Sequence, residues 1–313
     1  MRKFIESNAD FNFSNNHSLE EPYEDFMNNG MYLYSRANCD RSIANTMDGF
    51  KNSIRKIVYA GFLRNLIHEI KVCQFAGFVS EKTGYQHGED SLNGSIIHLS
   101  QNFVGSNNIN LFVPQGQFGT RLLGGKDAAS ERYIFTYLNP ITRKIFPEVD
   151  DAILEYVEDD GYVIEPIYYV PIIPMILVNG TKGIGTGFST NIPPHNPLDI
   201  IANIRNYLEN KNLELLSELT PWFKGFEGRI EKINDCTYNT FGISTTINEN
   251  TVRITELPIG TWTENYLEFL EGQVEDGTFI TDYKNNSGNY KIDIEINFAN
   301  GKLQGLIKTD TLN

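Results

Sequence analysis

The sequence lacks any long apolar run, and cysteine is scarce. No stretch approaches the about 18 uninterrupted apolar residues of a membrane-spanning helix. The first 30 residues are acidic and rich in asparagine rather than basic and then apolar, which argues against a secretory signal peptide. The three cysteines, Cys39, Cys73 and Cys236, match no zinc or disulfide spacing. We therefore expect no membrane association and a reducing compartment.

Positive charge is also in short supply. The 313 residues include 26 Lys and Arg against 40 Asp and Glu, for a formal net charge of −14. Binding to nucleic acid needs Lys and Arg against the phosphates, so this average disfavours such a partner. The segment from Arg36 to Lys144, however, holds 13 Lys and Arg against 8 Asp and Glu, which leaves −19 on the remainder. A basic segment on an acidic body is typical of a local DNA-binding face, although such segregation also arises by chance.

The rest of the composition fits a globular protein with two domains. Hydrophobic residues make up 40% of the chain and charged residues 21%, as in ordinary folded proteins. The length of 313 residues exceeds that of one typical domain. Residues 1–30 show no sustained periodicity, so we expect them to form a loose leader without a chemical role.

Three helices are predicted within the basic segment. Apolar residues recur at three- and four-residue steps in Thr46–Leu66 and again in Lys71–Lys82, which a turn at Gly84 would end. Ser91 is expected as the N-cap of a third helix that runs to Phe103. Short helices joined by a glycine turn predict a helix-turn-helix, but many helical pairs that bind nothing share this pattern.

Beyond the third helix the periodicity changes. Residues 104–130 are rich in Gly, Ser, Asn and Gln and predict a long ordered loop or a short ribbon, and loops of this length are usually functional. The second half alternates between helical and strand-like patterns, so the sequence predicts an α+β class. Its segments are an acidic stretch (Glu148–Asp160), an apolar β-like run (Tyr168–Val178), a helix (Leu198–Leu208) and two short alternating segments (Arg229–Ile233 and Thr251–Leu257).

Four sequence blocks follow one another around the long loop. They are Gln101–Asn108, Gly116–Arg121, Gly124–Ser130 and Arg132–Thr136. In order and spacing these blocks closely resemble the active-site block of eukaryotic-type type IIA DNA topoisomerase, topoisomerase II. Further matches extend the resemblance over roughly residues 33 to 300, at Pro171–Met175, Asn179-Gly180, Gly183–Gly187, Thr255–Pro258 and Thr261–Thr263.

The resemblance implies a fold and a wider protein. It implies a winged-helix domain with the catalytic tyrosine over residues 31–160, then an α/β tower domain over residues 161–313 that stops before a coiled-coil gate. The family also has an ATPase domain that binds ATP and a Toprim domain that holds Mg²⁺, and we recognise the motifs of neither in this sequence. We therefore expect a piece of a longer protein, a truncated gene product or one subunit of a split enzyme.

Tyr133 is the nucleophile that the resemblance implies. A phenol, with a pKa of about 10, must become phenolate-like to attack a phosphodiester, so it needs cations nearby. Arg132 supplies one such cation. The resemblance adds Arg41 on the scissile phosphate and His87 close by, and these four residues form the expected catalytic set.

Each of the two distant residues also has an ordinary structural interpretation. Arg41 could form a surface salt bridge with Asp40 or Asp48, and His87 could cap a helix or pack. Two departures from the family pattern bear on the same site. Glu131 stands where the family has proline before Arg-Tyr, and glutamine precedes His87 where the family favours a second histidine.

The DNA-binding residues are expected to be long cations and one apolar wedge. Ile184, in Gly-Ile-Gly-Thr-Gly, corresponds by resemblance to an isoleucine that wedges between base pairs and bends the duplex. The alternative for this motif is a glycine-rich phosphate loop, although it fits neither nucleotide-binding fingerprint. The cations are candidate phosphate contacts or else ordinary solvated charges; they are Lys51, Arg55, Lys56, Arg121 and Lys126.

The function expected from these observations is that of the core of an ATP-hydrolysing type II DNA topoisomerase, an isomerase. It would break and rejoin double-stranded DNA through a 5′-phosphotyrosyl intermediate at Tyr133, with Mg²⁺ and ATP bound by parts outside this chain. The expected partners are double-stranded DNA, a Toprim- and ATPase-bearing segment or subunit, and a second copy in a homodimer. The expected location is the nucleus, or a cytoplasmic replication site if the source is viral. The alternatives are a DNA-binding and bending module that does not cleave, or a subunit of a split topoisomerase.

Overall fold

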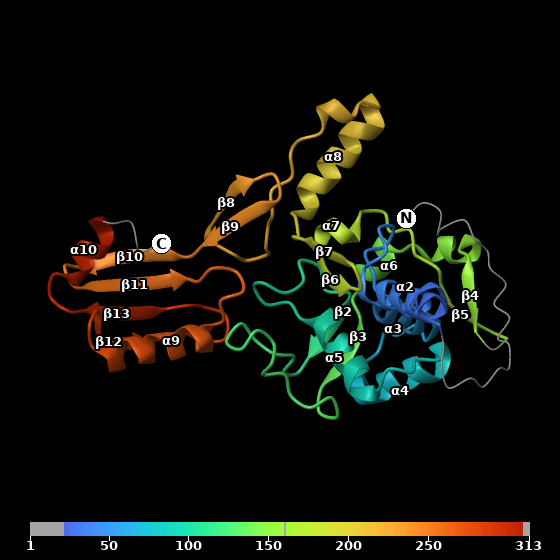
Figure 1. Cartoon of the computed structure of the whole chain (residues 1–313), viewed down its shortest axis with the longest axis horizontal. Helices are drawn as coiled ribbons and strands as arrows, with labels where there is room; N and C mark the ends of the chain where they lie inside the picture. The colour runs from blue at the N-terminus through green and yellow to red at the C-terminus, as the bar shows by residue number, and fades with distance from the viewer. Residues whose placement is uncertain (1–21, 160, 309–313) are drawn as a thin grey trace.

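Two separate hydrophobic cores organise the chain, which is elongated in Figure 1. The computed structural model describes residues 22–159 and 161–308. The first core gathers buried side chains from residues 50–200, and the second gathers them from residues 252–303. The first core thus takes in part of the range that the resemblance assigns to the tower domain.

A long helix leads into the first core. It consists of α1 (Tyr23–Asp25), the π-helical η2 (Phe26–Met31) and α2 (Tyr32–Ser42), which follow one another directly. The end of the expected leader is therefore helical rather than loose, and residues 1–21 lie outside the described residues. None of these three elements has a buried residue. Because hydrophobic periodicity reveals only a helix that buries one face, the sequence pattern missed this one.

The three predicted helices of the basic segment are confirmed with shifted bounds. They are α3 (Asn52–Leu63), α4 (Val72–Thr83) and α5 (Glu89–Ser100). Their buried positions follow the three- and four-residue steps of the sequence, and the apolar faces pack into the first core. Gly84 ends α4 in the left-handed conformation, with φ of 58°, as the sequence predicted.

Two helix starts differ from the prediction. Asp48 accepts a hydrogen bond from the Phe50 backbone N–H at 2.9 Å, and this turn delays α3 to Asn52. The predicted N-cap Ser91 is wrong, because α5 already begins at Glu89 and Gly88 is its N-cap. Gly88 has φ of 88°, a conformation that serine rarely adopts.

An antiparallel sheet completes the first three-helix unit. Its strand order is β1 (Ile70–Lys71), β3 (Phe135–Leu138), β2 (Phe112–Gln115). Helices α3 to α5 with this small sheet form a winged-helix arrangement, which matches the α+β class expected from the sequence. Strand β3 begins two residues after Tyr133, so the sheet fixes where that tyrosine leaves the core.

The remaining elements of the first part are short. The expected strand in Tyr168–Val178 is absent from these described residues, because Pro171 and Pro174 cannot donate to a strand ladder, and the run ends instead in a helical turn. The predicted helix in Leu198–Leu208 is confirmed. The elements are α6 (Thr142–Ile145), η3 (Glu148–Ile153), β4 (Tyr156–Asp159), β5 (Tyr162–Pro166), α7 (Met175–Val178), β6 (Thr181–Gly185), β7 (Phe188–Ile192), α8 (Pro197–Asn210) and η4 (Leu213–Leu215).

The second core lies between a four-stranded antiparallel sheet and two helices. The sheet has the order β10-β11-β13-β12, and a separate two-stranded hairpin, β8-β9, precedes it (Figure 1). The predicted strands in Arg229–Ile233 and Thr251–Leu257 are confirmed as β8 and β11. The elements are β8 (Arg229–Asn234), β9 (Thr237–Phe241), β10 (Ile243–Asn248), β11 (Thr251–Glu256), α9 (Thr263–Asp276), β12 (Ile280–Asn285), β13 (Ile294–Phe298) and α10 (Lys302–Lys308).

The helices within residues 22–159 and 161–308 include none that is both long and apolar enough to span a bilayer.

Candidate active site and nucleic-acid interface

Tyr133 projects from the protein beside a buried neighbour. Its side chain is 71% exposed, whereas Ile134 is 1% exposed. The Ile134 carbonyl accepts a hydrogen bond from the Val72 backbone N–H at 3.1 Å, and the Tyr133 N–H donates to the Ser130 carbonyl at 2.9 Å. Because Ile134 is held in the core, the backbone beside Tyr133 is fixed in position, and the tyrosine side chain points to solvent.

Arg132 and Glu131 share a hydroxyl beside this tyrosine. The Arg132 guanidinium lies 5.8 Å from the centre of the Tyr133 ring. Its Nε donates to Ser130 Oγ at 3.2 Å, and that hydroxyl donates to Glu131 Oε2 at 3.1 Å. The cation expected next to the phenol is therefore present, and the carboxylate that departs from the family pattern is connected to it through one serine.

The loop that precedes Tyr133 is held by its own polar contacts. The Thr120 backbone N–H donates to Asp127 Oδ1 at 2.8 Å, and the Thr120 hydroxyl binds the same carboxylate. Gln101 Nε2 donates to the Phe118 carbonyl at 2.9 Å. The expected long ordered loop is thus confirmed as ordered, and residues 112–115 within it form β2.

The same loop is also bound to the second core. Arg121 forms an ion pair with Glu256 and donates to the Leu257 carbonyl at 3.0 Å, and both charged side chains are buried. A Cβ at Gly124 would lie 2.2 Å from the Trp262 indole, so the indole closes directly over the loop backbone. Arg121 therefore joins the two cores, and its expected role as a phosphate contact is contradicted by this burial and pairing.

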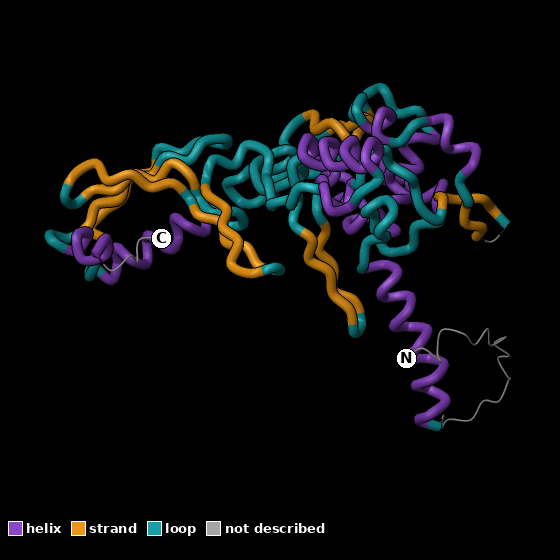
Figure 2. The backbone as a smooth tube through the Cα atoms, turned by 90° about the horizontal axis from the view of Figure 1, so that it is seen from above, coloured by secondary structure: helices purple, strands orange, loops and turns teal. Residues whose placement is uncertain are grey.

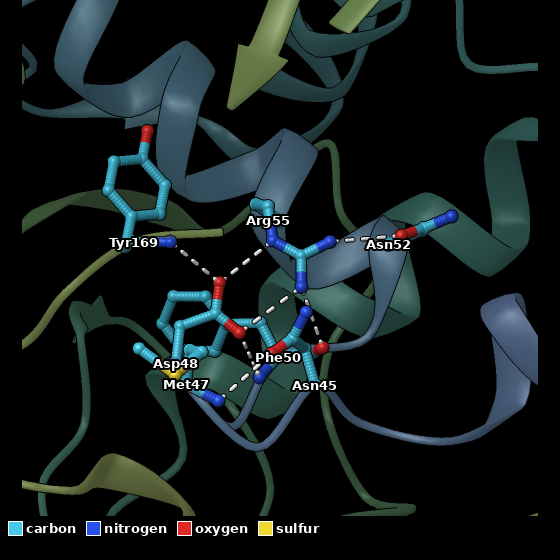
Figure 3. A network of polar contacts seen from close by, with 7 residues as sticks. All are labelled: Asn45, Met47, Asp48, Phe50, Asn52, Arg55 and Tyr169. Carbon is cyan, nitrogen blue, oxygen red and sulfur yellow. Dashed lines mark hydrogen bonds and ion pairs between the residues drawn. The ribbon is translucent and has the colours of Figure 1, made fainter. Parts of the chain in front are cut away.

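Arg55 and Lys56 are also engaged inside the protein. Arg55 donates from Nε to Asp48 Oδ2 at 2.8 Å and from Nη2 to Asp48 Oδ1 at 3.1 Å, in a network with both side chains buried (Figure 3). Lys56 Nζ lies 2.8 Å from Glu165 and 2.6 Å from the Thr83 carbonyl. The expectation that Arg55 meets a DNA phosphate is corrected, because its charge is matched by a buried carboxylate, which a buried cation requires. Lys56 is only half-buried and borders an open cleft, but its charge is likewise matched by Glu165.

Arg41 and His87 border the same cleft. It has a volume of about 810 Å³ and is bordered by α2, α3 and the turn between α4 and α5. The His87 ring packs edge-on against Tyr85, with ring centres 5.6 Å apart. Burial raises the pKa of the Tyr85 phenol, and the positive charge of Arg41 opposes that rise. The Tyr85 phenol therefore lies within electrostatic reach of Arg41 and in ring contact with His87.

The salt-bridge interpretation of Arg41 does not fit the carboxylates that were weighed for it. Asp40 lies 4.0 Å from Arg36, and Asp48 belongs to the Arg55 network. Arg41 itself is exposed. Among the described residues that border the cleft, Tyr133 and Arg132 are absent. The expected catalytic set thus falls into two places, with Arg41 and His87 in the cleft and Arg132 and Tyr133 on the loop.

The two remaining lysines have open surroundings. Lys51 borders a second cleft, of about 550 Å³, together with Lys182 and His98. Lys126 is exposed on the loop before Tyr133. Two of the five expected phosphate contacts are therefore placed where a phosphate could approach them.

Ile184 points away from the protein because of its glycine neighbours. It is 75% exposed in the β6-β7 hairpin. A Cβ at Gly183 would lie 2.2 Å from the Ser42 carbonyl, and a Cβ at Gly185 would lie 3.0 Å from Cys39 Sγ. Since side chains alternate along a strand, the two glycines face α2 and Ile184 faces the opposite way. The phosphate-loop alternative is wrong here, because these glycines form a hairpin and not a strand-to-helix turn.

Two residues that hold the site were not singled out from the sequence. Asn38 accepts hydrogen bonds from the Thr186 N–H at 2.9 Å and the Thr186 hydroxyl at 3.2 Å, at the turn of the β6-β7 hairpin. Trp262 covers Gly124 and packs edge-on against Phe103. The glycine alternation around Ile184 is the sequence signal for a close neighbour such as α2, but it does not say which segment that neighbour is.

Acidic, histidine and cysteine side chains are the groups that could hold a metal ion. No group of three or more His, Cys, Asp or Glu side chains in the described part of the chain is arranged to hold a metal ion. The resemblance places the Mg²⁺ on a Toprim domain, and not on the residues described here.

Comparisons with known proteins identify relatives of this chain. A family model that describes the A-type subunit of DNA gyrase/topoisomerase IV matches residues 41–312. DNA topoisomerase 2 of Candida albicans is 52% identical over 251 residues, which covers 80% of this chain and 17% of that protein. DNA topoisomerase 2 of Plasmodium falciparum (isolate K1 / Thailand) is 50% identical over 285 residues, which covers 90% of this chain and 20% of that protein. The chain thus spans about a fifth of the length of these relatives.

A solved structure shows the same fold. The crystal structure of the Plasmodium falciparum topoisomerase II DNA-binding, cleavage and re-ligation domain matches with a TM-score of 0.88 and 48% sequence identity. The match covers 92% of this chain and 39% of that one. With the family model extending over most of its length, the chain belongs to the DNA gyrase/topoisomerase IV family of A-type subunits, and its eukaryotic relatives are type II DNA topoisomerases.

Proposed function

We propose that this chain is the breakage-and-rejoining part of a type II DNA topoisomerase, with Tyr133 as the nucleophile. The observation that carries the proposal is the placement of Tyr133, 71% exposed, with the Arg132 guanidinium 5.8 Å from its ring. An exposed phenol beside a cation, at the end of a rigid loop, is arranged to meet an anionic partner.

The reaction is a transesterification at a backbone phosphate. The Tyr133 phenolate oxygen forms a bond to phosphorus, and the bond from phosphorus to the 3′ oxygen breaks. The 3′ oxygen leaves with a proton as a hydroxyl, and the protein remains joined to the 5′ end. Attack by that hydroxyl reverses the step, so rejoining needs no added energy. Arg132 stabilises the phenolate and the charge that develops on the phosphate.

Arg41 and His87 are proposed to act from their own cleft. Arg41 is exposed there and can bind a phosphate oxygen, and His87 can carry a proton near pH 7. Because they do not share a cleft with Tyr133, bound DNA must bridge the two places, either within one chain or between two copies. Their assignment to the scissile phosphate comes from the family resemblance.

Double-stranded DNA is the proposed partner. Lys51 and Lys126 are the retained phosphate contacts, and Ile184 is the proposed wedge, because its side chain is exposed at a hairpin that glycine holds against α2. Homodimerisation and a nuclear location follow from the relationship to eukaryotic topoisomerase 2 and are proposals of the same kind. Mg²⁺ and ATP are proposed to bind to a Toprim- and ATPase-bearing segment or subunit.

A covalent trapping experiment tests the proposal. The chain is combined with a Toprim-containing partner, Mg²⁺ and duplex DNA labelled at its 3′ end, and the reaction is stopped with denaturant. We expect an adduct on the 5′ end of cleaved DNA, located at Tyr133 by mass spectrometry and absent from Tyr133→Phe. Tyr290→Phe is the matched control, because Tyr290 is 84% exposed and lies far from this loop in the sequence.

Three outcomes would contradict parts of the proposal. An adduct that persists in Tyr133→Phe would place the nucleophile elsewhere. Cleavage by the chain with no partner would show that the residues for the whole reaction are present here. No adduct with a competent partner, together with normal DNA bending, would favour the alternative of a DNA-bending module, for which the exposed Ile184 is the supporting observation.

A further inference from the structure

The β6-β7 hairpin (residues 181–192), here called the wedge hairpin, is hydrogen-bonded to helix α2. Strand β6 packs against α2, and the two project from the same side of the first core (Figure 2). At the hairpin turn, the Thr186 N–H and hydroxyl donate to Asn38 Oδ1 at 2.9 and 3.2 Å. The Cys39 thiol donates to the Thr186 carbonyl at 3.4 Å. The end of the hairpin is thus attached to one turn of one helix.

The same turn of α2 carries Arg41. Residues three apart on a helix lie on one face, and Asn38 and Arg41 accordingly border the same 810 Å³ cleft. Asn38 therefore connects two functional parts. On one side it binds the hairpin that presents Ile184, and on the other it belongs to the helix turn that presents Arg41.

The hairpin has few other attachments near its tip. Gly183 and Gly185 bring its backbone against α2 but contribute no side chains, and Ile184 and Phe188 are 75% and 64% exposed. A two-stranded hairpin is only marginally stable by itself. Its tip is therefore positioned mainly by the polar contacts that Asn38 and Cys39 make with Thr186.

We propose that Asn38 is a positioning residue that keeps the Ile184 wedge in register with Arg41, so that the duplex is bent where the phosphate is held. This inference rests on the proposed function. Asn38 need not touch DNA, because its acceptor oxygen is already used by Thr186. Its effect on cleavage passes through the placement of the hairpin relative to α2.

The chemistry of the contact suggests three variants. Asn38→Ala removes the acceptor for both Thr186 donors. Asn38→Asp keeps an acceptor oxygen at the same place and is the conservative replacement. Asn191→Ala is the matched control, because Asn191 is an exposed asparagine on the same hairpin. It lies opposite Lys182 in the register of the two strands.

The experiment uses the chain assembled with a Toprim-containing partner and Mg²⁺. Bending of a doubly labelled duplex is followed by energy transfer, and the covalent adduct is trapped in parallel. We expect Asn38→Ala to lower the bent fraction and the adduct yield together, by about tenfold. Asn38→Asp and Asn191→Ala should stay close to wild type.

A pre-kinked substrate separates positioning from folding. A duplex with a flexible gap at the bend costs little free energy to bend, so its bending does not depend on the wedge. With this substrate, the adduct yield of Asn38→Ala should return to near the wild-type yield. A loss on both substrates, or a loss in Asn38→Asp as well, would show that Asn38 only supports folding and would overturn the inference. Unchanged bending and adduct in Asn38→Ala would overturn it too.

The proposed function can fail separately. In that case wild type forms no adduct on either substrate, but the bending measurement still compares Asn38→Ala with wild type. Bending that is lost in Asn38→Ala and kept in Asn38→Asp would then support the role of Asn38 in placing the wedge. Equal bending would reject it.

Discussion

Removal of the Glu256 carboxylate should separate the two cores without unfolding either. Glu256 is 3% exposed and pairs with Arg121, which is 5% exposed. It also accepts from the backbone N–H of Glu227 at 3.2 Å and of Leu257 at 2.8 Å. Glu256→Ala leaves a buried guanidinium and these two donors without their acceptor. Breaking a buried pair from one side costs about 3–5 kcal/mol.

The lost free energy should weaken the contact between the two cores, and not the cores themselves, because the cores are separate. We call this contact, made by Arg121 and Glu256, the joint. The side chains of one lie within residues 50–200 and those of the other within residues 252–303. Trp262 lies at the joint, over Gly124 and beside Phe103, so its fluorescence, measured with Trp222→Phe in every variant, reports contact between the parts. In urea, Glu256→Ala should expose Trp262 at a lower concentration than that which removes the far-ultraviolet circular dichroism signal. In wild type the two transitions should lie closer together.

Two controls set the scale of this effect. Glu218→Ala removes an exposed partner of Lys232, with side chains 65% and 39% exposed, and should change stability by about 1 kcal/mol or less. The double variant Arg121→Met with Glu256→Leu replaces the buried charges with apolar groups and should recover much of the loss. If Glu256→Ala behaves like Glu218→Ala, the ion pair does not hold the cores together and the reasoning is refuted.

Three further predictions concern DNA and pH. The chain alone should bind duplex DNA weakly and with strong salt dependence, because its basic charge is local; titrations at two salt concentrations that gave equal affinities would remove the phosphate-contact interpretation. Ile184→Ala should reduce duplex bending and leave thermal unfolding unchanged, since the side chain is 75% exposed; a lowered Tm would instead assign Ile184 to packing. Burial lowers the pKa of His195, so the unfolded chain takes up its proton more readily than the folded one. Stability should therefore decrease as the pH falls through about 6.5, and a smaller decrease is expected in His195→Gln; an identical pH profile in that variant would exclude His195 as the cause.

Helices that bury one face were predictable from this sequence. Helices α3, α4 and α5 each show three- and four-residue apolar steps, and each was found within a few residues of its bounds. The helix through residues 23–42 buries no residue, so it left no periodic signal. The apolar run Tyr168–Val178 gave a false strand, because hydrophobicity alone does not show whether backbone donors are available, and two prolines remove them.

The site was predictable where sequence neighbours determine it. Arg132 and Tyr133 are adjacent, so their contact needed no knowledge of the fold. The cations were harder, because lysine and arginine look alike on a helix whether they face solvent or a buried carboxylate. Arg121 finds its partner 135 residues away, at Glu256, and no local pattern marks such a pair. Lys126, only five positions later, remains exposed.

Glu131 changes how the positive charge of the site is distributed. Arg132 Nε and the Glu131 carboxylate bind the same hydroxyl, that of Ser130, so a full negative charge lies two hydrogen bonds from the guanidinium. That carboxylate orients the guanidinium through the serine, and it also offsets part of the positive potential that a phosphate would meet. At the effective dielectric of a protein surface, a unit charge at such a distance changes the energy by about 1 kcal/mol or more. Under the proposed function, cations outside this loop must then contribute more than they would with an uncharged residue at position 131. Arg41, which is exposed in a separate cleft, is the proposed source of that charge.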